Sequence, residues 1–179
     1  QKLHSSIPLP VEVDVDVGDG SPHRTIRYRV RDGAWDFKER RFAGFLQSST
    51  ITVGNGDADT LVSEVNYHLG EGDDRVLRGK PHRTELRDGT GLIFQTETAT
   101  WEALLLAGFP NHPLLALPVS TQSTTIKQEL GSSFGVTTRK ETTYDSTEGY
   151  PLRITNLGHS SKSGDEQVLV KHYIDTHEG

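Results

Sequence analysis

Hydrophobic and polar residues alternate one by one along most of the chain. Valines alternate with acidic residues over 11–17, and apolar residues alternate with arginines over 26–31. The same two-residue period continues over 61–69, 92–98 and 168–174. Because successive side chains of a β-strand point to opposite faces, this period predicts half-buried antiparallel strands.

Turn-forming sequences separate the alternating segments. Gly, Asp, Asn and Ser gather at 18–22, 54–57, 70–74, 88–91 and 163–165. Such clusters between alternating segments are a strong signal for hairpins. Long strands joined by hairpins form a meander, and a meander of about eight to ten strands tends to curl on itself. We therefore expect an all-β fold, a single-domain antiparallel β-barrel or half-barrel over residues 1–179, with a frayed segment at 1–7.

One segment departs from the two-residue period. Residues 101–108 hold Ala, Leu, Glu and Trp without a β-branched residue, and Gly108 stands where a helix would end. Helix formers followed by glycine predict one short helix, with a buried strand at 104–106 as the alternative. This segment and the apolar stretch that continues to residue 119 would either line a ligand cavity at the barrel mouth or pack on the sheet as core.

Composition narrows the function classes without naming one. The 179 residues are 32% hydrophobic and 25% charged, carry a formal net charge of −6, and include neither Cys nor Met. Disulfides, thiolate nucleophiles and Cys-ligated zinc are thereby excluded. The acidic balance argues against a nucleic-acid partner, and no apolar run is long enough for a membrane-spanning helix. Gln1 in place of an initiator Met suggests a processed chain, which favours a secreted or periplasmic location and leaves a cytoplasmic one open.

The sequence lacks the motifs of common catalytic and cofactor sites. The eight His show no His-Glu-x-x-His spacing, and neither a Gly-x-Ser-x-Gly elbow nor a phosphate-binding glycine loop is present. The acidic turns at 54–61 and 70–76 each resemble one nonapeptide calcium repeat, but their starts are too far apart to stack, so they read as hairpin tips. We expect no metal and no cofactor.

Aromatic side chains with inward parity suggest a binding function. Such groups would present an apolar wall to a small apolar molecule inside a barrel, and ordinary core packing is the alternative. The predicted ligand-binding residues are Trp35, Phe37, Tyr67, Phe94, Trp101 and Leu105.

An enzyme on the same barrel is the alternative function. His172 shares the parity of Val168 and Val170, so it would face inward as an acid or base, with Tyr28 or Tyr144 as its partner. These three residues would serve a cofactor-independent cyclase, isomerase or lyase; the competing interpretation of His172 is a hydrogen-bonded core histidine. A third hypothesis is a structural or interaction domain that packs through an exposed sheet edge. The oligomeric state stays open.

The densest positive region is an arginine stripe on one strand. Arg24, Arg27, Arg29 and Arg31 lie within eight residues, and the last three share one parity. They would either receive an anionic ligand or pair across strands with the acidic row over 12–16.

Two short elements resemble known ligand carriers. Gly33-Ala34-Trp35 is similar to the Gly-x-Trp element near the first strand of lipocalins, and 144–154 resembles a strand–turn–strand unit of periplasmic half-barrel lipid carriers. The resemblance implies a lipocalin-like or calycin-like meander. Each match covers one short element, so it assigns no functional residue.

Overall fold

The fold is a single antiparallel β-sheet. The computed structural model describes residues 9, 11–16, 24–54, 56–57, 59–70, 72–108, 111, 115–128 and 135–173. Within these residues there are ten strands and one short 3-10 helix: β1 (Glu12–Val15), β2 (Arg24–Asp36), β3 (Arg41–Thr52), β4 (Leu61–Tyr67), η1 (Gly72–Leu77), β5 (Pro81–Asp88), β6 (Ile93–Leu104), β7 (Leu117–Gln128), β8 (Gly135–Tyr144), β9 (Pro151–His159) and β10 (Gln167–Val170). The segment expected to fray, 1–7, lies outside the described residues.

Each strand pairs with its neighbours in the sequence. The order across the sheet is β1 to β10 without a crossover, and every pair is antiparallel. The predicted all-β meander is therefore confirmed.

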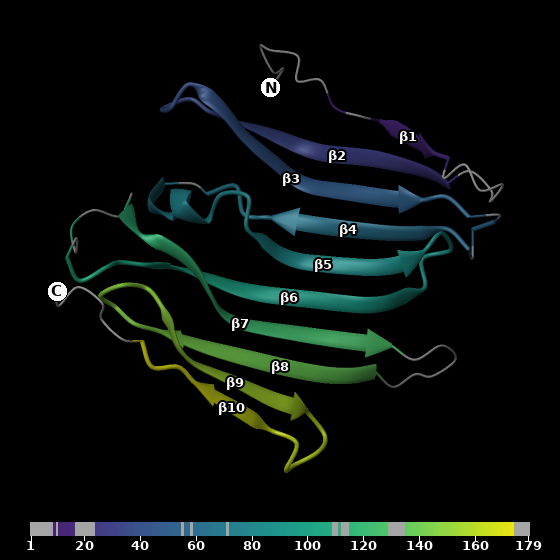
Figure 1. Cartoon of the computed structure of the whole chain (residues 1–179). Helices are drawn as coiled ribbons and strands as arrows, with labels where there is room; N and C mark the ends of the chain where they lie inside the picture. The colour runs from purple at the N-terminus through teal and green to yellow at the C-terminus, as the bar shows by residue number, and fades with distance from the viewer. Residues whose placement is uncertain are drawn as a thin grey trace.

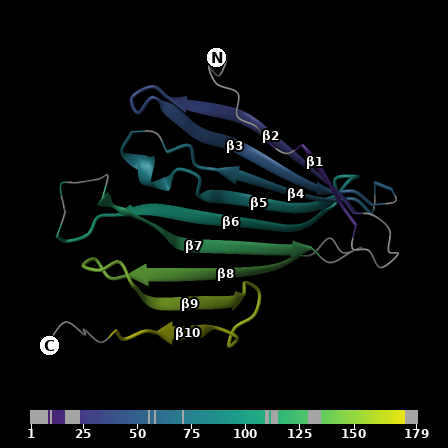
Figure 2. The same ribbon diagram turned by 45° about the horizontal axis from the view of Figure 1, so that its top comes forward.

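The sheet does not close into a barrel, so of the predicted barrel or half-barrel the closed form was wrong. Figures 1 and 2 show β1 and β10 at opposite margins of an open, twisted sheet. Closure needs two edge strands that can form a ladder with each other. Here both edge strands are only four residues long, and each pairs on one side within the described part of the chain.

The strand register separates two faces. On one face, three arginines of β2 stand opposite three residues of β3: Arg27 opposite Ile51, Arg29 opposite Ser49 and Arg31 opposite Gln47. The same face continues over β4 and β5 mainly with charged and polar residues. We call this the polar face. The other face carries alternate positions such as Ile26, Tyr28 and Val30.

Cross-strand ion pairs form part of the polar face. Arg27 donates to Glu12 over 2.6 Å, and Thr25 donates to Asp14 over 2.6 Å. The predicted pairing of the acidic and basic rows is thus confirmed for Glu12 and Arg27, whereas Asp14 stands opposite Thr25.

The core of this single layer is thin. Among the described residues, no large side chain is completely buried. The buried hydrophobic residues are few, and most are small: Ala43, Val62, Leu77, Ala116 and Val119. No second layer covers either face in the described chain, which explains why many larger apolar side chains stay exposed.

The helix predicted over 101–108 is absent, and that prediction was wrong. The segment continues β6 to Leu104, where Glu102, Ala103 and Leu104 pair with residues of β7. Hydrogen bonds to the neighbouring strand outweigh helix propensity, because the helix propensities of ordinary residues differ by only about 0.7 kcal/mol per residue. The alternative strand at 104–106 is also wrong in its bounds, because the strand ends at Leu104 and Leu105 is 43% exposed.

The helical turn that does form is η1, between β4 and β5. Gly70 precedes it with a φ of +64°, a conformation that glycine adopts without strain. No helix in the described part of the chain has the length and hydrophobicity needed to cross a membrane.

Candidate functional site

Two adjoining hollows lie at one end of the sheet. Figure 1 shows η1 and the β2–β3 hairpin together at this end. The first, which we call the aromatic hollow, has a volume of about 570 Å³. The second, the hairpin hollow, has a volume of about 320 Å³. Leu69 and Gly70 line both, so the hollows share a wall.

The hollows are lined by different strands. The aromatic hollow is lined by Leu46, Tyr67, His68, Leu69, Gly70, Asp74, His82, Ala99, Thr100 and Trp101. The hairpin hollow is lined by Ala34, Trp35, Asp36, Phe37, Lys38, Ala43, Leu69, Gly70, Arg75 and Arg78.

Arg78 holds the shared wall in place. Its guanidinium donates to Asp36 over 2.7 Å and to Glu39 over 3.0 Å, both in the β2–β3 hairpin. It also donates to the backbone carbonyls of Leu69 and Gly70, over 3.2 and 3.4 Å. One largely buried side chain therefore ties the hairpin to the segment that leads into η1.

The hairpin turn is organised around Asp36. Its carboxylate accepts hydrogen bonds from the backbone N–H groups of Lys38 and Glu39, each over 3.0 Å. The N–H of Glu39 and the Arg78 guanidinium lower the pKa of Asp36 to about 2. Bonds from Arg41 and Arg78 likewise lower the pKa of Glu39, which also accepts from Arg75 over 3.0 Å.

Two histidines meet in the aromatic hollow. The rings of His68 and His82 are 5.1 Å apart between centroids, and the backbone N–H of His68 donates to the Lys80 carbonyl over 3.0 Å. Burial, together with the neighbouring His68 and Arg83, lowers the pKa of His82. The Nε2 atom of His68 is buried without a hydrogen-bond partner in the described structure. No group of three metal-ligating side chains occurs among the described residues.

The aromatic side chains of this hollow are fixed by hydrogen bonds. The Nε1–H of Trp101 donates to the Pro81 carbonyl over 2.7 Å, and Lys80 Nζ lies 5.5 Å from the centre of its ring. The Tyr67 hydroxyl and Ser48 Oγ are 3.0 Å apart. These bonds set the orientation of both rings, which leaves their apolar surfaces to form the wall.

The structure brings four of the six predicted ligand-binding residues to this end of the sheet. Tyr67 and Trp101 line the aromatic hollow, and Trp35 and Phe37 line the hairpin hollow. Phe37 is 65% exposed, so it contributes to the rim.

The other two predicted ligand-binding residues lie elsewhere. Phe94 stands near the start of β6, at the end opposite Trp101, and Leu105 follows the last residue of β6. Neither lines one of the two hollows.

The three predicted acid–base residues lie apart. Tyr28 is on β2, Tyr144 ends β8 and donates to the Ser120 carbonyl over 3.0 Å, and His172 follows β10. Six strand spacings of about 4.8 Å separate β2 from β8 across the sheet, on the order of 29 Å. His172 is exposed instead of facing inward, because β10 ends at Val170.

Sequence patterns missed Arg78 and the histidine pair. Arg78 lies 42 residues from Asp36, and His68 lies 14 residues from His82. The local signal was a polar segment rich in turn residues between β4 and β5, with His68 before it and His82 after it. The partners of Arg78 and of the two histidines could be assigned only from the three-dimensional structure.

Comparisons with known proteins show the fold alone. No family model and no curated protein matches the chain. Solved structures do match, among them the crystal structure of TcdB2-TccC3 without hypervariable C-terminal region, with a TM-score of 0.62 and 15% identity over 86% of this chain. The crystal structure of TcdB2-TccC3-Cdc42 gives a TM-score of 0.60 at 15% identity over 86% of this chain. This chain corresponds to 10% of the length of each of those chains.

Proposed function

We propose that this chain is a structural sheet module that joins further β-structure through the free edge of β10. The observation that carries the proposal is the chemistry of that edge. The strand Gln167–Val170 holds no charged residue, and Val168, Leu169 and Val170 are each about half exposed. An uncharged, apolar edge strand is a template for pairing with another strand.

The register supplies the hydrogen-bonding groups for such pairing. Lys171 N–H donates to the Leu152 carbonyl, so these two residues form a hydrogen-bonded pair of the β9–β10 ladder. Such pairs recur every second residue. The backbone groups of Val168 and Val170 therefore point away from β9 and face the free edge.

The opposite edge differs in charge. By the same alternation, counted from the bond between Tyr28 N–H and the Val11 carbonyl, the backbone groups of Glu12 and Asp14 face outward from β1. Charged residues in an edge strand discourage strand addition, and β1 has two of them where β10 has none. This contrast selects β10 as the joining edge.

The fold comparison supports a module of this kind. In the TcdB2-TccC3 structures, a sheet of this shape accounts for about a tenth of a much longer chain. The thin core of the present sheet fits the same use, because a single layer buries little apolar surface by itself.

Val168→Pro tests the proposed edge. Without its natural neighbour, the chain should dimerise through β10, and sedimentation velocity over a concentration series should detect this. Proline removes an outward N–H and adds a ring, so the variant should associate about tenfold more weakly. The intramolecular ladder keeps its bonds, because the Val168 N–H does not point at β9.

Glu12→Pro is the matched control, because it removes an outward N–H at the opposite edge. Its self-association should equal that of the wild type. A wild type that stays monomeric at every concentration, or a Val168→Pro chain that associates as strongly as the wild type, would contradict the proposal.

Binding of a small, largely apolar molecule is the second candidate function. The observation in its favour is the convergence of Tyr67 and Trp101 on the aromatic hollow, next to Trp35 in the hairpin hollow. A volume of about 570 Å³ falls within the usual range of ligand sites. A catalytic version would need an acid–base pair other than His172 with Tyr28 or Tyr144.

Trp101→Phe tests the ligand proposal with the uncharged fluorescent probe N-phenylnaphthylamine. The probe's emission should rise on binding, and the variant should bind it about fivefold more weakly, since it loses about 1 kcal/mol of apolar contact. Phe94→Leu, at the other end of β6, should bind the probe as the wild type does. Equal affinities in all three proteins would argue against the aromatic hollow as a ligand site.

A further inference from the structure

A third hollow lies on the polar face, across β2 to β5, away from the aromatic and hairpin hollows. Its volume is about 750 Å³. We call it the arginine hollow, because three arginines line it. The residues that matter to its chemistry are Arg29, Arg31, Gln47, Ser49, Glu64 and Arg87.

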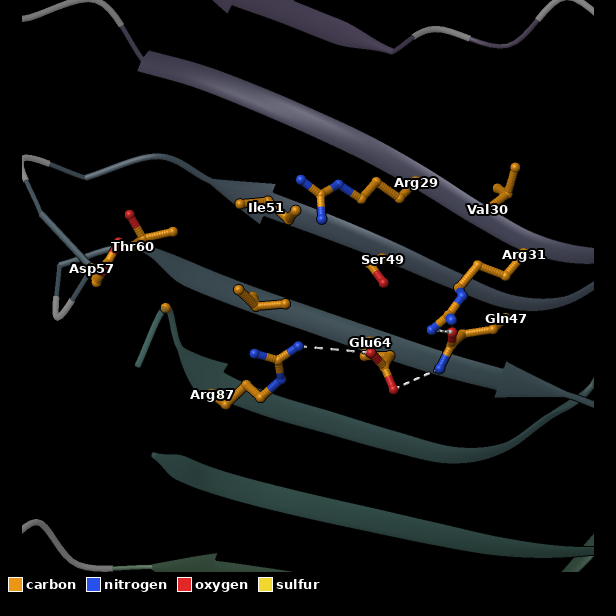
Figure 3. A pocket seen from close by; sticks show the side chains of 12 residues that line it. Arg29, Val30, Arg31, Gln47, Ser49, Ile51, Asp57, Thr60, Glu64 and Arg87 are labelled. Atoms are coloured by element: carbon orange, nitrogen blue, oxygen red, sulfur yellow. Dashed lines mark hydrogen bonds and ion pairs between the residues drawn. The ribbon is translucent and has the colours of Figure 1, made fainter. Parts of the chain in front are cut away.

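The three guanidinium groups reach into the hollow from two sides. Figure 3 shows Arg29 and Arg31 extending from β2, Arg87 extending from β5, and Ser49 between them. Two strands, β3 and β4, form the floor between the two sets of arginines.

Arg29 and Arg31 differ from Arg27 and Arg139, which lie on the same face. Arg27 pairs with Glu12 over 2.6 Å, and Arg139 pairs with Glu141 over 2.6 Å. Neither Arg29 nor Arg31 forms an ion pair with a described residue; Arg31 donates only to the neutral Gln47, over 3.3 Å. Charges left without a carboxylate are available to an external anion.

The carboxylates of the hollow leave the two β2 arginines unmatched. Glu64 accepts from Gln47 over 2.6 Å and lies 3.8 Å from Arg87, so its charge is opposed within the hollow. Asp57 lies at the end of the hollow beside Thr60 in Figure 3, on the loop between β3 and β4. The whole chain carries a net charge of −6, so two neighbouring arginines without a carboxylate partner among the described residues depart from its general character.

The spacing of the two arginines restricts the ligand. Arg29 and Arg31 are two residues apart on one face of β2, and such positions repeat at about 6.8 Å along a strand. In an extended peptide, acidic side chains at alternate positions repeat at the same distance. Ile51 and Val62 add apolar surface beside the charges, which suits a peptide more than a bare phosphate.

We propose that the arginine hollow binds an extended acidic peptide whose carboxylates occupy alternate positions and contact Arg29 and Arg31. The peptide would lie along β2 over Ser49. This site uses side chains of the polar face and is independent of the β10 edge and of the two hollows at the end of the sheet.

Fluorescence anisotropy with labelled peptides tests the proposal at low ionic strength. The peptide Thr-Glu-Thr-Glu-Thr should bind more tightly than Thr-Glu-Glu-Thr-Thr, which has the same charge with the wrong spacing. Arg29→Gln and Arg31→Gln should each weaken binding about fivefold, and the double variant about 25-fold, as expected for exposed ion pairs of about 1 kcal/mol. Added salt should reduce the affinity.

Arg139→Gln is the matched control, because it removes a charge from the same face outside the hollow. It should bind the peptide as the wild type does, and circular dichroism should show that every variant keeps the sheet. Equal affinity for the two peptides, or unchanged binding by the double variant, would overturn the proposal. Displacement of the peptide by ATP at a lower concentration than by unlabelled peptide would also overturn it, in favour of a phosphate site.

Discussion

Arg78→Met should lower the free energy of unfolding by about 2 kcal/mol, as measured by urea denaturation at neutral pH. The side chain is only 12% exposed and donates to two carboxylates and two backbone carbonyls. Hydrogen bonds to charged groups contribute about 1.5–3 kcal/mol, and methionine removes the Arg78 donor from both carboxylates, which keep their bonds to the hairpin N–H groups and to Arg41 and Arg75. Arg83→Met, which removes an exposed partner of Glu85, should change stability by less than about 0.5 kcal/mol.

The effect of Arg78→Met should shrink in acid. The pKa of Asp36 is about 2 in the folded protein and lies near its ordinary value of 3.8 in the unfolded chain. A depressed pKa adds stability above the unfolded value, and that stability is lost as the pH falls toward the folded value. Part of the depression comes from Arg78, so the difference between the two proteins should narrow from about pH 4 to about pH 2. A difference that stays constant over this range would mean that Arg78 stabilises the fold through its backbone hydrogen bonds and packing and not through Asp36.

Gly70→Ala should destabilise the protein more than Gly79→Ala, although both positions have a positive φ. Gly70 has a φ of +64° and Gly79 a φ of +74°, so each alanine carries a similar backbone penalty of about 1 kcal/mol. A Cβ at Gly70 would lie 2.9 Å from the Arg78 Cβ and 3.0 Å from the Asp74 carbonyl oxygen, whereas a Cβ at Gly79 meets no atom within 4 Å. Overpacking at Gly70 should add about 1–3 kcal/mol.

Thermal unfolding of both glycine variants separates the two causes. Gly79→Ala measures the cost of the left-handed backbone alone, and the excess at Gly70 measures the close approach of Arg78. Equal shifts in the two variants would show that the shared wall of the hollows can move aside. Binding of N-phenylnaphthylamine to the same two variants reports whether that wall shapes the aromatic hollow.

The alternation of side chains was enough to predict the strands, because it depends only on local geometry. It placed Val13 and Ile26 on one side and Glu12 and Arg27 on the other, as the register shows. It could not predict closure, since closure depends on how the two distant edges meet. The helix prediction failed for a related reason: the ladder between Leu104 and Leu117 forms across a connection that local propensity does not include.

The candidate sites depended even more on register. Aromatic residues could be chosen by parity, but an irregularity in the ladder between Ala34 and Trp35 shifts the pairing on β2, so Tyr28 and Trp35 had to be placed by the structure. The arginine stripe was visible in the sequence, yet the sequence could not show which members are paired. Arg27 forms an ion pair with Glu12, whereas Arg29 forms none with a carboxylate of the described residues.

The neighbour-only order of the strands has a consequence for how such a sheet can change in size. Because each strand in the described chain contacts only those before and after it in the sequence, a hairpin can be added or removed at a margin without altering the register elsewhere. Each hairpin changes the width by about 9.6 Å, twice the spacing of neighbouring strands. Insertions and deletions of two strands can therefore adjust the span of the surface in discrete steps, as repeats lengthen a solenoid.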